Sequence, residues 1–255
     1  MTTILKIGGS VLTDKNKASA ARPEVIVRIA REISDNPGEG LILIHGAGSF
    51  GHHQAKEYRL TEGLNDWSIK GILPTHNAVK SLNKMVIDAL QMGGIDALPV
   101  HPLSACTLKN GRINGMCLDA IRLMLHAGIV PVLHGDVVMD SVNGEGILSG
   151  DQLVVYLATE LKADRVGIGS NVDGVFDHGS KVIEKITPAD KSKVIGMLSG
   201  SSGVDVTGGM LGKVTELMAL AEAGIPSRVF NAETPGNVAK FLKNDLNEGT
   251  FICGE

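Results

Sequence analysis

The chain has 255 residues, of which 43% are hydrophobic, 20% are charged and only 3% are aromatic, and its formal net charge is −4. This length allows one α/β domain or two small ones. The scarcity of aromatic residues and the slightly negative charge exclude a general nucleic-acid-binding surface. No apolar run approaches the roughly 20 residues of a transmembrane helix, no signal peptide is visible, and the three cysteines form no CxxC pair. A cytoplasmic protein that binds neither membrane nor nucleic acid is therefore expected.

Short apolar runs alternate along the chain with segments of helical periodicity. The strands expected from these runs are residues 3–7, 41–45, 97–100, 129–133, 164–169 and 227–231. A first helix opens at Pro23, and the later helices are expected at residues 68–92, 117–127, 151–161, 210–223 and 236–243. Pro74 could interrupt the long second helix. Continuous apolar strands between helices predict a largely parallel sheet in a three-layer α/β/α sandwich, formed by residues 1–255 as a single domain.

Two hairpin turns are expected to interrupt this alternation. Asn110-Gly111 and Asn143-Gly144 are dipeptides that favour type I′ turns between antiparallel strands. Residues 170–209, rich in Gly, Ser and Asp, begin the second half of the chain but do not mark a separate folding unit.

Two glycine clusters stand where apolar strands end. Lys6-Ile7-Gly8-Gly9-Ser10 closes the first strand, and His45-Gly46-Ala47-Gly48-Ser49-Phe50-Gly51-His52 follows the second. Glycine lets backbone N–H groups approach an anion closely and curve around it. Two such loops, one with a lysine and one closed by a histidine, predict a site that handles phosphate on both sides of a transfer.

Two other nucleotide motifs fit less well. Residues 46–51 match GxGxxG after a strand, but no acidic residue ends a second strand about 20 positions on, as a dinucleotide site requires. The glycines at 208, 209 and 212 before Lys213 have the wrong spacing for a Walker A loop, and no Ser or Thr follows the lysine.

Several polar residues at strand and helix ends could carry the chemistry. Lys6 could stabilise a transferring phosphoryl group or simply extend to solvent from a strand end, and Lys15 could belong to a solvated loop. His52, which we expect in the first turn of a helix, could donate a hydrogen bond to phosphate, whereas His45 suits the core. Asp151 follows a possible Ser149 cap and could orient two lysines. The remaining candidates are Asn171-Val172-Asp173-Gly174 after a strand and Thr207-Gly208-Gly209-Met210 before Lys213.

Taken together and in this order, these sequence motifs, which extend from residue 6 to residue 213, resemble those of the amino acid kinase superfamily. Within it, Gly48-Ser49-Phe50-Gly51-His52, Thr13-Asp14-Lys15, His134-Gly135-Asp136 and the segment from Leu198 to Gly209 resemble isopentenyl phosphate kinases. Ala47 stands where that pattern often has glycine. The resemblance implies ATP-dependent phosphorylation of isopentenyl phosphate to isopentenyl diphosphate, in an archaeal-type mevalonate route, by a homodimer.

The resemblance also implies roles for individual residues. It implies catalytic roles for Lys6, Lys15, His52, Asp151 and Lys213. It implies ATP binding by Lys6, Gly8, Gly9, Ser10, Gly48, Asp173, Gly174, Gly209 and Lys213. It implies acceptor binding by Gly46, Ala47, Gly51, His52, Leu148 and Gly150. Mg²⁺ would arrive bound to ATP, with no separate protein metal site. Residues up to about 165 would form the acceptor side, and residues from about 166 the nucleotide side.

The identity of the acceptor stays open at this point. A relative acting on an amino acid, UMP or a fosfomycin-type phosphonate would share most of these motifs, and a nucleotide-sensing module without turnover is a further alternative. If the acceptor carries a hydrocarbon tail, the apolar face of helix 68–92, with Leu82, Met85 and Val86, is expected to limit its length.

Overall fold

The computed structural model describes residues 1–36, 38–198 and 209–255. Its main sheet has eight strands in the order β10-β12-β11-β9-β1-β2-β6-β3. These strands are β1 (Thr3–Ile7), β2 (Leu41–His45), β3 (Ala97–Pro99), β6 (Val130–His134), β9 (Arg165–Ser170), β10 (Lys185–Ile186), β11 (Ser227–Asn231) and β12 (Thr250–Ile252). All neighbouring pairs are parallel except β11 with β12. The predicted largely parallel sheet is therefore confirmed.

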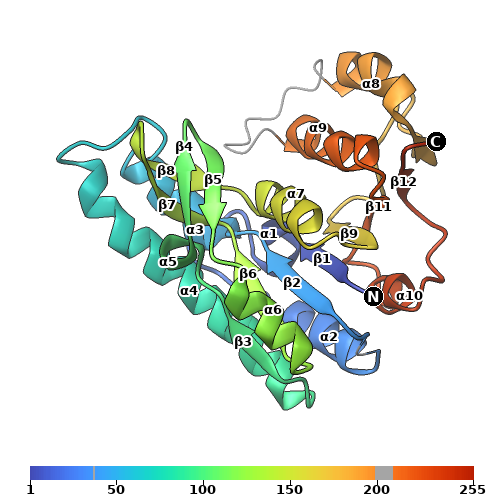
Figure 1. Cartoon of the computed structure of the whole chain (residues 1–255), viewed down its shortest axis with the longest axis horizontal. Helices are drawn as coiled ribbons and strands as arrows, with labels where there is room; N and C mark the ends of the chain where they lie inside the picture. The colour runs from blue at the N-terminus through green and yellow to red at the C-terminus, as the bar shows by residue number, and fades with distance from the viewer. Residues whose placement is uncertain (37, 199–208) are drawn as a thin grey trace.

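Helices cover both faces of this sheet, as Figure 1 shows. One face packs on α2 (Pro23–Ser34), α4 (Ser68–Met92) and α10 (Asn237–Leu242), and the other on α6 (Asp119–His126), α7 (Gly150–Glu160) and α9 (Gly209–Glu222). Successive strand residues alternate between the two cores: Ile4 joins the α7 side and Leu5 the α2 side. Lys6 therefore points to the same side as Ile4, toward α7. The predicted three-layer sandwich is confirmed.

A second sheet lies at the end of the molecule opposite β11 and β12 (Figure 1). It has the order β5-β4-β7-β8 and is built from two hairpins, β4 (Cys106–Lys109) with β5 (Arg112–Met116), and β7 (Asp136–Asp140) with β8 (Gly144–Leu148). Asn110 and Gly111 both have positive φ, 52° and 74°, as a type I′ turn requires.

The turn of the second hairpin is not the predicted type I′ turn. Gly144 has φ 82° but Asn143 is not left-handed, and residues 141–143 form a three-residue turn between the paired Asp140 and Gly144. The Asp140 carboxylate fixes this turn by accepting hydrogen bonds from the backbone N–H groups of Val142 and Asn143. It also accepts from the N–H groups at the tip of the other hairpin. Burial alone would raise the pKa of Asp140, but these hydrogen bonds hold it at about 2.

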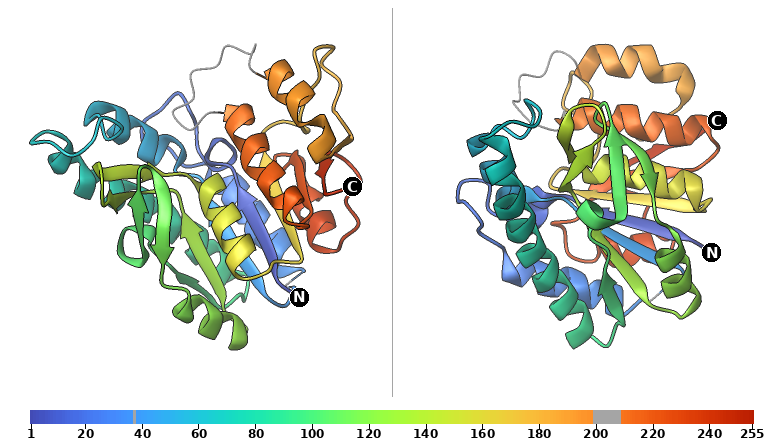
Figure 2. Two further views of the ribbon diagram at one scale, coloured as in Figure 1. Left: turned by 45° about the horizontal axis from the view of Figure 1, so that its top comes forward. Right: turned by 60° about the vertical axis from the view of Figure 1, so that its left-hand side comes forward.

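Several short helices were not predicted. They are α1 (Gly9–Leu12), α5 (Pro102–Ala105), the 3₁₀ turn η1 (Pro188–Asp190) and α8 (Lys191–Leu198). The helix expected to contain His52 is present as α3 (Gly48–Glu57). In the right-hand view of Figure 2, α8 stacks on α9 at the top of the molecule. Helix α4 continues through Pro74 without a break, because the buried face formed by Val79, Leu82 and Leu90 holds the helix against the core.

Candidate active site

Three charged side chains from distant parts of the chain meet near the carboxyl end of the central strand β1. The Lys6 Nζ on β1 lies 2.9 Å from Asp151 Oδ1 at the start of α7. The Lys213 Nζ on α9 lies 3.2 Å and 3.1 Å from the two oxygens of the same carboxylate. The side chains are only 7%, 15% and 12% exposed for Lys6, Asp151 and Lys213. The expected pairing of one carboxylate with two lysines is therefore present.

The charges in this triad shift one another's protonation. Burial, opposed by Asp151 and aided by Lys213, lowers the pKa of Lys6 to about 8. Burial alone would raise the pKa of Asp151, but the two lysines hold it far below its usual range. The triad carries a net positive charge when Lys6 is protonated, so it can attract and hold phosphate oxygens.

Local sequence places Asp151 at a helix N-terminus. Ser149 is the N-cap of α7, and its Oγ accepts a hydrogen bond from the Gln152 N–H at 3.1 Å. Gly150 packs against Lys6: a Cβ at Gly150 would lie 3.4 Å from Lys6 Cε, an ordinary van der Waals distance. Ser149 is therefore the helix cap that the sequence suggests, and the same cap sets Asp151 in the first turn of α7.

The two glycine clusters pack directly on each other. A Cβ at Gly9 would overlap the backbone of Gly48, and a Cβ at Gly46 would lie 2.5 Å from the Gly9 nitrogen. Gly48 has φ 52°, and a Cβ there would lie 2.8 Å from the Gly9 carbonyl oxygen. Only residues without side chains allow this contact, which brings the N-termini of α1 and α3 together at the carboxyl ends of β1 and β2.

His52 lies in the second turn of α3, because the helix already begins at Gly48. The prediction of a first-turn position was wrong: the glycine cluster does not form a separate loop before the helix but makes up its first turn. Gly51 allows α3 to approach α4, since a Cβ there would lie 3.1 Å from Val79 Cγ2. Ala47 is the N-cap of α3, and His52 remains partly exposed.

Leu148 can contribute to acceptor binding only through its backbone. Its side chain is fully buried in the core on the α7 side. Its carbonyl oxygen lies 3.2 Å from where a Cβ at Gly135 would stand, and the N–H groups of Gly150 and Ala47 are next to the same point. Backbone groups of three segments therefore converge beside Lys6.

Lys15 is not brought to the triad. It lies exposed on a turn at residues 14–17, and its side chain makes no hydrogen bond or ion pair within the described part of the chain. The segment that carries it is anchored to α3: the Ser49 N–H donates to Thr13 Oγ1 at 3.0 Å, and the Ala20 N–H donates to Ser49 Oγ at 3.2 Å. Sequence reasoning gave Ser49 no such role.

The expected nucleotide-side residues gather at the ends of β9 and β11. Ser10 Oγ donates to Asn171 Oδ1 at 3.1 Å, which links α1 to the turn after β9. Asn231 Nδ2 donates to Asp173 Oδ1 at 2.9 Å. Asp173 and Asn231 line a groove of about 540 Å³, large enough for part of a nucleotide. Close packing explains the glycine at position 174, because a Cβ there would lie 2.7 Å from Thr250 Oγ1.

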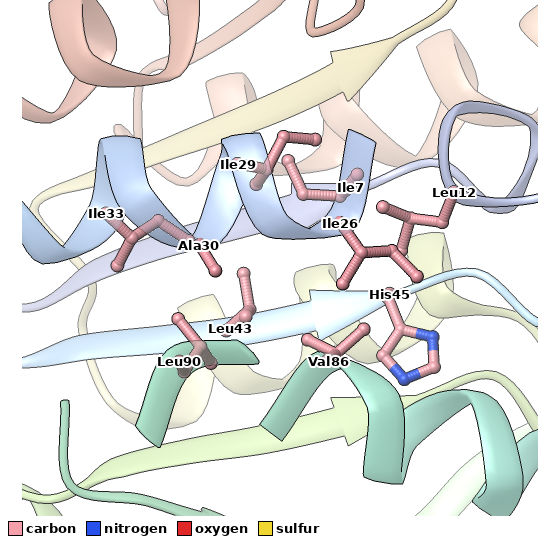
Figure 3. Close-up of a pocket in the computed structure, with 10 residues that line it drawn as sticks. All are labelled: Ile7, Leu12, Ile26, Ile29, Ala30, Ile33, Leu43, His45, Val86 and Leu90. Carbon is pink, nitrogen blue, oxygen red and sulfur yellow. The ribbon is translucent and has the colours of Figure 1, made fainter. Parts of the chain in front are cut away.

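Gly209 begins α9 with φ 55°. It places the N-terminus of a 14-residue helix one turn before Lys213. Thr207 and Gly208 lie outside the described residues. The small cavity drawn in Figure 3 is unrelated to this site: it measures about 10 Å³ and lies between α2, α4 and the sheet, with His45 among its lining residues.

A largely buried histidine cluster, which the sequence did not predict, lies around the carboxyl ends of β2 and β6. His45 and His134 end β2 and β6, are paired in the sheet, and stack with ring centroids 5.6 Å apart. His101 Nδ1 lies 2.9 Å from His134 Nε2, and His76 Nδ1 lies 2.9 Å from Asp136 Oδ2. Burial lowers the pKa of His45, His101 and His134. The prediction that His45 is a core histidine is confirmed.

Within residues 1–36, 38–198 and 209–255, no group of three or more His, Cys, Asp or Glu side chains could hold a metal ion. In the same part of the chain, no helix is both long and apolar enough to span a membrane.

The match to known proteins agrees with this geometry. Residues 1–231 match the amino acid kinase family, and the chain belongs to that family. More particularly, it is 40% identical over 266 residues to the isopentenyl phosphate kinase of Methanothermobacter thermautotrophicus, with 99% of each chain covered. It is 41% identical over 254 residues to that of Haloferax volcanii, covering 99% of this chain and 98% of the relative. An X-ray structure of isopentenyl phosphate kinase superposes with a TM-score of 0.86 at 36% identity, covering 99% of this chain and 100% of the other.

Proposed function

We propose that this protein transfers the γ-phosphoryl group of ATP to isopentenyl phosphate, giving isopentenyl diphosphate and ADP. The observation that carries the proposal is the Asp151 carboxylate held between Lys6 and Lys213 beside two interlocked glycine turns. An oxygen of the acceptor phosphate forms a bond to Pγ, the bond from Pγ to the β–γ bridging oxygen breaks, and ADP leaves with that electron pair. The attacking oxygen is already ionised, so no strong general base is required.

The two lysines stabilise the charge that develops on the transferring group. Asp151 positions both ammonium groups and offsets their mutual repulsion, which allows two cations to lie close together in a largely buried site. Both oxygens of the Asp151 carboxylate accept from the lysines, so its charge is already compensated within the protein. Mg²⁺ fits this site as a companion of the ATP phosphates, where it would neutralise charge on the β and γ groups.

On the acceptor side, His52 binds the acceptor phosphate together with backbone N–H groups near Gly46, Ala47 and Gly150. On the nucleotide side, Gly8, Gly9, Ser10 and Gly48 approach the ATP phosphates. Asp173, Gly174 and Gly209 lie toward the rest of the nucleotide. In this proposal, residues up to about 165 form most of the acceptor side and residues from about 166 most of the nucleotide side of a single domain. The glycine turns at Gly8, Gly9 and Gly48 lie between the two sides. Lys15 can assist only if its turn moves toward the phosphates.

The tail of the acceptor packs on a small apolar cluster beside α3, which we term the tail cluster. Its buried members are Ala55, Leu60 and Val137, and its partly exposed members are Tyr58, Ile72 and Ile147. The residues expected to limit tail length do not belong to it. Leu82 and Val86 are buried in the core against α2, and Met85 is 42% exposed on the surface. The apolar stripe on the C-terminal half of α4 is therefore a packing face.

A homodimer in the cytoplasm completes the proposal. Strand β3 is an open edge of the main sheet, and Leu98 on it is 41% exposed, with Leu123 and Met92 also exposed nearby on α6 and α4. An open edge flanked by apolar side chains favours pairing with a second copy. The free thiols of Cys106, Cys117 and Cys253 suit a reducing compartment. Sedimentation velocity tests the dimer, and Leu98→Lys should shift it toward monomer.

An acceptor screen tests the proposed reaction. ADP release is measured with isopentenyl phosphate, dimethylallyl phosphate, UMP, glutamate and fosfomycin at equal concentrations. Isopentenyl phosphate should give the highest kcat/KM. A higher value with UMP, glutamate or fosfomycin would assign the chain to another activity of the same family.

A further inference from the structure

The most unusual buried group outside the triad is the carboxylate of Glu145 on β8. The residue is 2% exposed, and within the described part of the chain neither carboxylate oxygen has a hydrogen-bond partner. The nearby Ser68 hydroxyl already donates to the Gly63 carbonyl at 3.1 Å. Burying a carboxyl group without partners is costly. The free-energy cost of burying this carboxyl group suggests that it serves a function.

Glu145 adjoins the tail cluster. It lies two residues from Ile147 on β8, so both side chains point to the same face of the small sheet. Ile147 packs there with Ala55 of α3 and Ile72 of α4. The segment between these helices closes over the hairpin, since the Leu64 N–H donates to the Asn143 carbonyl at 2.9 Å. Glu145 is therefore the polar end of an otherwise apolar region.

Distances along β8 place Glu145 beyond a short acceptor tail but within reach of a long one. Leu148 marks the phosphate end, where its carbonyl adjoins Gly135 and Gly150. Glu145 lies three residues from Leu148, or about 10 Å along the strand. With carbon–carbon bonds of about 1.5 Å, an extended isopentenyl tail reaches roughly 5 Å and a geranyl tail roughly 10 Å.

We propose that Glu145 closes the far end of the acceptor tail site and disfavours long apolar tails through its polarity rather than its size. This inference rests on the proposed function and deepens it. A five-carbon tail ends on the tail cluster and leaves the carboxyl group untouched. A ten-carbon tail must place hydrocarbon in contact with the Glu145 carboxyl group and exclude water from it.

The length preference should then depend on pH. Burial raises the pKa of Glu145 to about 7, and the Ser68 hydroxyl opposes that rise. The titratable side chains that are not fully exposed on the elements packed around it are His52, Tyr58, His76, Asp136 and Asp140. Among the described residues, none of these side chains makes a hydrogen bond to the Glu145 carboxylate. A neutral carboxyl group tolerates hydrocarbon better than an ionised one, so acid should favour long tails.

The test is the ratio of kcat/KM for geranyl phosphate to kcat/KM for isopentenyl phosphate in the wild-type enzyme. We expect this ratio to be about five- to tenfold higher near pH 6 than near pH 8. Both acceptors carry the same phosphate, so titration of that phosphate, of Lys6 and of His52 cancels in the ratio. Where turnover of geranyl phosphate is slow, its inhibition constant against isopentenyl phosphate gives the same comparison.

Two variants separate polarity from size. Glu145→Gln keeps the shape and removes titration, and Glu145→Met keeps a similar volume and removes polarity. Both should abolish the pH dependence of the ratio, and Glu145→Met should raise the ratio about tenfold near pH 8. Glu57→Gln, an exposed carboxyl change on α3, should behave as wild type.

The outcomes are distinguishable. A ratio in the wild type that does not change with pH would overturn the role of Glu145 without any variant, and so would folded variants with the wild-type ratio and pH dependence. Absence of turnover with isopentenyl phosphate at every pH would instead contradict the proposed function, on which this role depends.

Discussion

At the scale of single residues, the triad makes the sharpest prediction. Lys6→Met removes a charge aimed at the transferring group while keeping much of the side-chain length. We expect kcat to fall by about 100-fold or more, with Lys213→Met giving a loss of the same order. Steady-state kinetics and circular dichroism check the two variants.

Lys109→Met is the matched control, because Lys109 is exposed on β4. It should keep wild-type kinetics. A Lys6→Met enzyme with full activity and an intact fold would return Lys6 to the role of a lysine that merely extends from a strand end.

The lowered pKa of Lys6 predicts an alkaline limit to ATP capture. Lys6 must be protonated to attract phosphate, and burial lowers its pKa to about 8, so its charge is lost as pH rises through that value. Because kcat/KM for ATP reports the free enzyme, it should decline above about pH 8, while kcat declines at higher pH since bound phosphate stabilises the charged lysine. A Lys6→Arg enzyme that retains activity should lack this alkaline decline. A wild-type profile that stays level to about pH 9.5 would show that Lys6 is not the group involved.

His52 and its neighbour give a second matched pair. His52→Ala should reduce kcat/KM for isopentenyl phosphate about 10- to 100-fold, mainly through KM, because a charge-assisted hydrogen bond is lost. The KM for ATP should change little. His53→Ala, an exposed change one position along the same helix, should have no comparable effect. Equal effects of the two variants would exclude phosphate binding by His52.

The sequence singled out Lys6, Asp151 and Lys213 because each stands in or next to the last residues of a strand or the first turns of a helix. The structure shows that the three side chains meet, and their catalytic roles stay predictions. Glu145 and His76 were missed because each looks like an ordinary polar residue in its segment. Their burial arises from contacts between α4 and the hairpins, which no local pattern records.

At the scale of elements, the close contact between the N-termini of α1 and α3 holds the two glycine turns of the site together. Gly48→Ala would combine a left-handed φ with a Cβ pressed against Thr13 and the Gly9 carbonyl. We expect it to lower the melting temperature and to abolish most activity. Gly94→Ala has the same left-handed strain, with φ 85°, but nothing within 4 Å of the new Cβ, and it isolates the strain, which costs about 1 kcal/mol.

Thermal unfolding followed by kinetics distinguishes the two glycines. Gly48→Ala should be the less stable protein and should lose activity even at temperatures where it is folded. If the two variants lose equal stability and both stay active, the close approach of the glycine turns is not required for the site.

The main helices and strands were predictable because each buries a regular face. The hairpin at Asn110-Gly111 followed from turn chemistry alone. The start of α3 was not predictable in the same way: its first turn contains two glycines, which local propensity disfavours, and it forms because Gly48 packs on α1 and Gly51 on α4. Similarly, α1 has only four residues and depends on tertiary contacts.

At the scale of the whole molecule, the alternation of strands and helices predicted the parallel sheet and its two helical layers. It could not predict that β4, β5, β7 and β8 join into a second sheet. Strands β4 and β7 pair at Leu108 with Asp140, and the Asp140 carboxylate holds the tips of the two hairpins together by hydrogen bonds. This second sheet carries Glu145 and part of the tail cluster, so the residues that we propose to select the acceptor could not be found from the sequence.

The central claim is that the Lys6–Asp151–Lys213 site phosphorylates an isoprenoid monophosphate. Phosphorus NMR of the purified protein with ATP, Mg²⁺ and isopentenyl phosphate tests it most directly. We predict that signals of ADP and of a new organic diphosphate grow together in equal amounts, and that Asp151→Asn slows both by about 100-fold or more. Loss of ATP without a new diphosphate, or equal diphosphate formation by wild type and Asp151→Asn, would contradict the account.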